Sequence, residues 1–81
     1  MKAIQVSRNG NKLFTAGLEE GILDARLVIR NQVDPVWFNV VGRDRSTGGH
    51  ANWAHISVRV GDTFTLQLVD VEASDIDETS T

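Results

Sequence analysis

Two histidines are the side chains of this 81-residue chain with the clearest capacity for acid–base chemistry. His55 precedes Ser57 by two positions in a run that alternates apolar and polar residues. On a strand the two side chains point to the same side, roughly 7 Å apart. No carboxylate stands close in sequence to orient the imidazole, as a hydrolytic triad requires. The pattern therefore predicts a solvated histidine and serine on a strand surface, and no catalytic residues.

The same histidines are the best candidates for metal ligands, together with Asp44. If His50 and His55 lie on one strand, their odd spacing directs them to opposite faces. Zinc sites need three or four ligands at characteristic spacings, and the chain has no cysteine. The glycine-containing segment 46–50 also lacks the pattern of a phosphate-binding loop. We expect no metal, no cofactor and no enzymatic activity.

A surface that carries tryptophan and arginine is the stronger functional signal. Residues 37–43 and 53–59 both alternate, and if they form neighbouring strands, their outward side chains share one face. Trp and Arg are the residue types most enriched at binding hot spots. The residues predicted to contact a partner are Trp37, Asn39, Arg43, Trp53, His55, Ser57 and Arg59. The alternative is that a second sheet covers this face, which would make both tryptophans core residues.

The elements that position these residues are expected to be short strands joined by turns. Asn9-Gly10 lies between two apolar-bearing runs and predicts a hairpin with a two-residue turn. The pairs that this turn implies are Arg8 with Asn11, Val6 with Leu13, and Ile4 with Thr15. Residues 22–30 alternate with a period of two, which favours a strand over a helix.

Two further segments decide how the remaining strands connect. The segment 31–35 contains Pro35 and is predicted to break the chain before a strand at 37–43. A two-residue loop at Gly61-Asp62 would mix the apolar residues of its flanking strands across both faces. Either the loop spans 61–63 with a bulge, or the flanking strands lie in different sheets. The chain is therefore predicted to be all-β, a small sandwich or partly open barrel of about six short, mainly antiparallel strands.

The charge divides the chain into a body and a tail. The net charge is −3, yet residues 1–69 carry eight basic and six acidic side chains, and every charged residue from Asp70 onward is acidic. We predict one β domain over residues 1–72 and an acidic, disordered tail over residues 73–81. No apolar run is long enough to span a bilayer and the first residues lack a signal-peptide pattern, so we expect a cytoplasmic protein without membrane contact.

Two resemblances accompany these patterns. The stretch VRVGDTFTLQLVDVE, residues 58–72, resembles the strand-VGD-strand segment of S1-type OB barrels, which implies binding of single-stranded nucleic acid. The stretches NGNKLFTAG, TGGHANW and VRVGDTFTLQLVDVEASD together resemble a family of small bacterial β domains with an N-terminal Asn-Gly hairpin and a C-terminal strand led by Val-Gly-Asp. This second resemblance implies a single bacterial domain and transfers no site residues.

The sequence thus predicts a non-enzymatic protein-interaction module, of the kind that acts as a small inhibitor, immunity or accessory protein or as a homodimer. Its partner would bind the face that carries Trp and Arg. The alternative is a nucleic-acid-binding, OB-like barrel, in which bases stack on the tryptophans and the acidic tail regulates binding.

Overall fold

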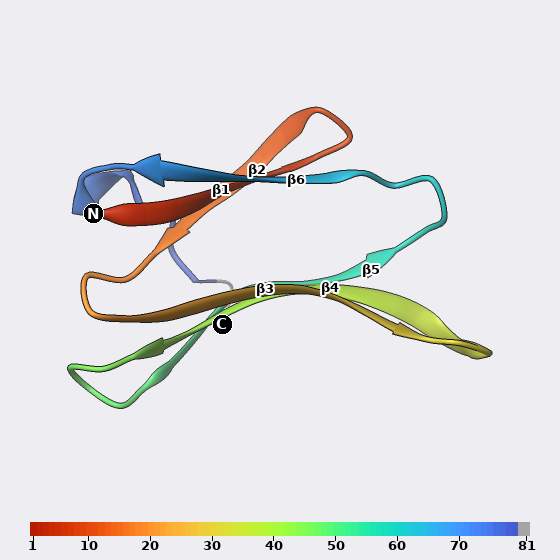
Figure 1. The fold of residues 1–81 in the computed structure, drawn as a ribbon, viewed down its shortest axis with the longest axis horizontal. Coiled ribbons are helices and arrows are strands. Elements are labelled where there is room, and N and C mark those ends of the chain that lie inside the picture. Colours follow the sequence, from red (N-terminus) through yellow and green to blue (C-terminus); the bar gives the residue numbers. More distant parts are fainter. Residues whose placement is uncertain (80–81) are drawn as a thin grey trace.

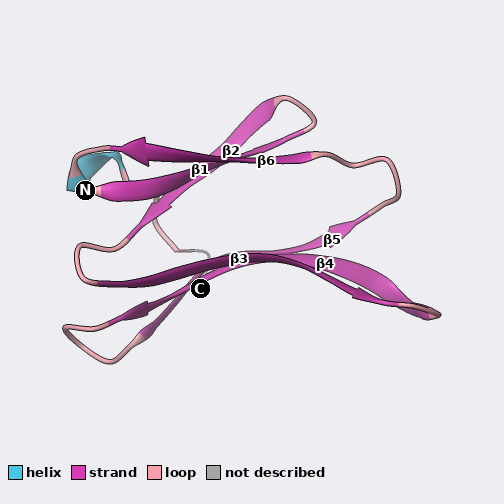
Figure 2. Ribbon diagram, viewed as in Figure 1, coloured by secondary structure: helices cyan, strands magenta, loops and turns pink. Residues whose placement is uncertain are grey.

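A computed structural model describes residues 1–79, which fold into two stacked antiparallel sheets (Figure 1). One sheet has the strand order β2-β1-β6 and the other has the order β3-β4-β5, and they do not join into a closed barrel (Figure 2). The all-β prediction is confirmed. The elements are β1 (Lys2–Arg8), β2 (Asn11–Gly17), β3 (Gly21–Arg30), β4 (Val33–Asp44), β5 (His50–Val58), β6 (Phe64–Asp70) and the 3-10 helix η1 (Ala73–Asp75). Among these described residues, no helix is long and apolar enough to cross a membrane.

The hairpin of β1 and β2 turns at Asn9-Gly10, as predicted. Both residues have positive φ, 51° and 84°, as a tight two-residue turn requires. Arg8 pairs with Asn11, but the predicted register beyond this pair is wrong. An extra residue, Leu13, interrupts β2, so that Val6 pairs with Phe14. Phe14 therefore points toward the core, and the side chain of Leu13 is left 43% exposed.

The hairpin of β3 and β4 is longer than the sequence indicates. The predicted strand over residues 22–30 is confirmed, but the predicted break over 31–35 is too long. Only Asn31 and Gln32 form the turn, and Arg30 pairs with Val33. Gln32 takes up the left-handed conformation that this turn needs, with φ 66°. The bond between Asp34 and Pro35 is cis and lies inside β4.

The last two strands belong to different sheets. β5 pairs with β4, whereas β6 pairs with β1, so the segment around Gly61-Asp62 crosses from one sheet to the other (Figure 1). This is the second of the two predicted solutions for this segment. Ile56 and Val58 before the crossover and Phe64 after it then pack against the same core, whereas Val60, Leu66 and Leu68 remain exposed.

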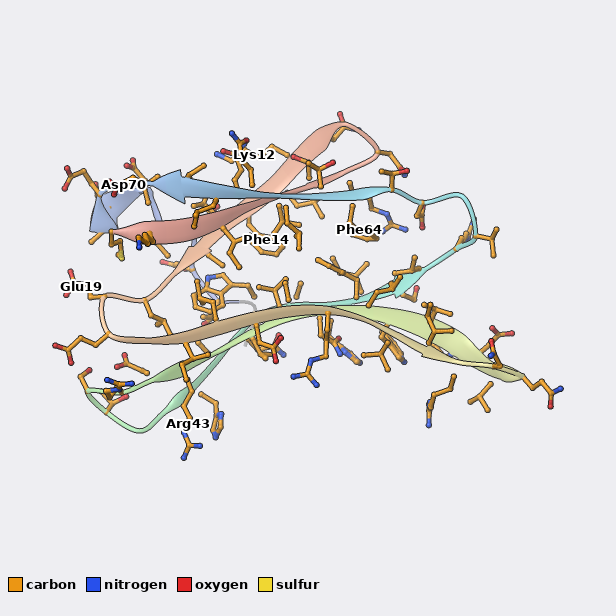
Figure 3. The ribbon with its side chains drawn as sticks, viewed as in Figure 1. Lys12, Phe14, Glu19, Arg43, Phe64 and Asp70 are labelled. Atoms are coloured by element: carbon orange, nitrogen blue, oxygen red, sulfur yellow. The ribbon has the colours of Figure 1, made fainter. Side chains whose placement is uncertain are left out.

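The core lies between the two sheets and contains side chains from both. The rings of Phe38 on β4 and Phe64 on β6 stack with centroids 4.2 Å apart. Figure 3 shows Phe14 and Phe64 pointing from one sheet toward the other. The buried residues of this cluster are Val6, Ala16, Phe38, Val40, Trp53 and Ala54.

The segment after β6 lies against the edge of β2. The sequence predicts a disordered tail from residue 73, whereas in the structure η1 is followed by Ile76, which packs against the core cluster. The backbone N–H of Asp77 donates to the carbonyl of Thr15 (2.9 Å), and the Asp77 carboxylate accepts from the Thr15 N–H (2.7 Å). The segment is too polar to form a core, so one apolar side chain and these hydrogen bonds attach it. Residues 80 and 81 lie outside the described part of the chain.

Candidate interaction surface

Trp53 lies in the core because of a bulge in β5. Val40 pairs with Ala54 and Val41 pairs with Asn52, which leaves Trp53 as an extra residue in its strand. At a bulge of this type two successive residues face one residue of the partner strand, and here both Trp53 and Ala54 point inward. Trp53 is only 7% exposed. Its expected outward position is therefore wrong, and we exclude it from the candidate surface.

The Trp53 ring is fixed from two sides. Its indole N–H donates to the backbone carbonyl of Asp77 at 2.9 Å, which joins the core to the segment after β6. On β4 the ring lies over Gly42, where an added Cβ would come within 3.0 Å of the ring. Gly42 thus provides the space that a large inward side chain at the bulge requires.

The opposite side of sheet β3-β4-β5 brings together most of the other predicted residues. Directly opposed residues of antiparallel strands share a face, so the registers define one outward set. Arg43 points away from the second sheet in Figure 3, and no described element lies over this side of the sheet in Figure 1. We call this set the outer face: Ile22, Asp24, Arg26 and Val28 of β3, Trp37, Asn39, Val41 and Arg43 of β4, and His50, Asn52, His55 and Ser57 of β5.

Two stacked rings form the centre of the outer face. The indole of Trp37 and the imidazole of His55 have centroids 3.9 Å apart and planes inclined by 12°. Asn39 lies directly opposite His55, and its Oδ1 is 2.6 Å from His55 Nδ1. An amide oxygen can only accept, so Nδ1 carries the proton in this contact. The contact holds the imidazole parallel to the indole and leaves Nε2 directed elsewhere.

Two arginines share the outer face with the two rings. Arg26 forms an ion pair with Asp24 on the same strand, and the hydrogen bond and charge of that carboxylate raise the pKa of Arg26. Arg43 is exposed, opposite His50, and its guanidinium makes no ion pair or hydrogen bond with residues 1–79. The outer face therefore carries two arginines and one carboxylate, an excess of positive charge beside an aromatic centre.

Arg59 does not belong to this face. It follows the end of β5 in the crossover, and its backbone N–H donates to the Asp62 carboxylate at 2.8 Å. The same carboxylate accepts from the Arg8 guanidinium (2.7 Å) and from the Asn9 amide (3.0 Å). These three donors, the Arg59 N–H foremost, lower the pKa of Asp62 to about 2. Asp62 of the Val-Gly-Asp motif thus connects the crossover to the first hairpin, which the sequence did not predict. We call the contacts of Asp62 with Arg8, Asn9 and Arg59 the latch.

Among residues 1–79, no side-chain hydrogen bond joins His55 to Ser57 or to a carboxylate. Ser57 lies opposite Trp37, while the hydrogen-bond partner of His55 is the amide of Asn39 and not a carboxylate. Within residues 1–79, no group of three or more His, Asp or Glu residues could hold a metal ion. What the surface offers is a partly aromatic and cationic area.

Comparisons with protein-family models, with curated proteins and with solved structures find no match to this chain.

Proposed function

We propose that the protein is a non-enzymatic interaction module that binds a partner protein through the outer face. The stack of Trp37 on His55 carries this proposal. A ring pair that is already ordered loses little conformational entropy on binding, so it can contribute its full contact area to a complex. Within the monomer, the two rings lie on the side of the sheet away from the core, where no described element covers them (Figure 1).

The charges of the outer face favour an acidic partner. Arg43 lies in the same face as the ring pair, and no group of residues 1–79 pairs with its guanidinium. A guanidinium binds a carboxylate through two parallel hydrogen bonds. Ile22 is exposed and Val28 is half-buried on the same side of the sheet, and both add apolar area there. A partner segment that combines carboxylates with apolar side chains would complement this surface, and such complementarity sets specificity and association rate.

The proposal is tested by the fluorescence of Trp37. The Trp53→Phe substitution makes Trp37 the only tryptophan of the variant. The probe is a blocked octapeptide in which Glu-Glu-Leu-Leu repeats, because each side of an extended peptide then carries both residue types. We expect the peptide to change the Trp37 emission saturably at low salt. Arg43→Ala should weaken this binding about tenfold, since one charge-assisted contact is lost.

The controls separate the chemistry of the partner. A Lys-Lys-Leu-Leu octapeptide should produce no saturable change. An eight-nucleotide oligo-dT tests the alternative of nucleic-acid binding, in which a base stacks on the ring pair of Trp37 and His55. Tighter binding of the oligonucleotide than of the acidic peptide, or equal responses to the acidic and basic peptides, would refute the proposal.

A further inference from the structure

β3 is an edge strand with an unusually favourable edge for further pairing. It has ten residues, Gly21–Arg30, and only β4 pairs with it in the described structure. Natural proteins usually protect such edges with proline, lysine, bulges or covering segments. The edge of β2 is covered in this way by Asp77, and β5 is interrupted by its bulge. β3 has neither device between residues 21 and 28.

Its apolar side chains also remain exposed. Ile22 is 64% exposed on the outer face, and Leu27 is 52% exposed on the inner side. On this side of the sandwich the second sheet also ends in an edge strand, β6, and Leu66 of β6 lines the same groove as Leu27. Edge strands with exposed apolar residues on both layers are typical of a surface that becomes buried on association.

The sequence of β3 is complementary to itself when read in the opposite direction. If Ala25 faces Ala25 of a second copy, Asp24 lies opposite Arg26 of that copy, and Arg26 lies opposite its Asp24. Leu23 then lies opposite Leu27, and Ile22 lies opposite Val28. Each opposed pair shares a face, so the charges meet on the outer face and the leucines meet beside the groove.

From this complementarity we infer that a second copy of the chain pairs antiparallel with β3, about a two-fold axis at Ala25. An isologous contact of this kind requires a self-complementary surface. In this register each residue faces a residue that lies an even number of positions away in the sequence. Residues whose backbone N–H and C=O point to the free edge in one copy therefore face residues with the same orientation in the other copy. The two β3-β4-β5 sheets become one continuous sheet, and both outer faces lie on the same side of it.

Other registers fit less well. A register shifted by one residue along the ladder would place the core side of one copy against the outer face of the other. An axis at Asp24 or Arg26 would oppose like charges, which destabilises a ladder. An axis at Leu27 would pair Asp24 with Arg30, but it would run through the irregularity between Val28 and Arg30.

The inference goes beyond the proposed function and is tested separately, by light scattering on a size-exclusion column at increasing protein concentration. The wild-type chain should approach twice its 8.9 kDa mass. Asp24→Arg and Arg26→Asp each oppose like charges at two symmetric positions. Each should raise the dimer dissociation constant about tenfold or more. The double variant Asp24→Arg/Arg26→Asp exchanges the two charges and should restore the dimer.

Two controls distinguish this result from misfolding and from failure of the proposed function. Circular dichroism should show the same spectrum for all variants. Arg43→Asp lies on the outer face in β4, which does not form the pairing edge, and should leave the dimer intact while it abolishes binding of the acidic octapeptide. A wild-type monomer at all concentrations would overturn the inference, as would a dimer that survives both single charge reversals.

Discussion

At the scale of residues, the two tryptophans have separate roles. Trp53 is buried, lies over Gly42 and donates its indole N–H to Asp77. Trp37 stacks on His55 at the surface. Both tryptophans belong to alternating runs, and a pattern of residue types alone places them on the same side. Only the bulge at Trp53 separates the two.

This separation predicts different effects on stability. Trp53→Ala should lower the free energy of unfolding by about 3–5 kcal/mol, because a large buried ring leaves a cavity. Trp37→Ala should cost about 1 kcal/mol, the contribution of one ring pair. Urea unfolding followed by circular dichroism measures both values. Equal losses for the two variants would contradict the assignment of Trp53 to the core and of Trp37 to the surface.

At the scale of elements, turns and alternation predicted most strands, and bulges limited what could be predicted. Asn9-Gly10 and the alternation over residues 22–30 are local signals, and the structure bears both out. The inserted residues Leu13 and Trp53 are both apolar, so neither disturbs the composition of its strand. Each nevertheless reverses the faces of all residues on one side of it. The insertions become recognisable only when the partner strand and its register are known.

The latch at Asp62 predicts how stability depends on pH. The folded pKa of about 2 lies below the ordinary value of 3.8. The latch therefore contributes its full stability above about pH 4 and loses it as the pH falls toward 2. The difference in urea midpoint between the wild type and Asp62→Asn should be large at pH 5 and should shrink toward pH 2. Asp34→Asn, which removes an exposed carboxylate, should retain the wild-type dependence; a constant difference for Asp62→Asn would exclude the latch.

At the scale of the whole molecule, contacts that stabilise the sandwich lie away from the outer face, which we propose as the binding surface. The segment 72–77 covers the edge of β2 through Asp77 and reaches the core through Ile76 and the carbonyl of Asp77. The crossover is latched to the first hairpin by Asp62. Within residues 1–79, no such segment covers the opposite side of sheet β3-β4-β5, which carries the ordered ring pair and Arg43. This asymmetry is the reason to assign binding to the outer face.

The most direct test uses the two indole N–H signals in a ¹⁵N-resolved NMR spectrum during titration with the Glu-Glu-Leu-Leu octapeptide. One indole belongs to the outer face, and the other is hydrogen-bonded to Asp77 in the core. We expect the Trp37 signal to shift saturably together with the amides of Asn39, Arg43 and His55, while the Trp53 signal stays in place. A shift of Trp53 without Trp37, or no shift of either indole at millimolar peptide, would contradict the assignment of binding to this face.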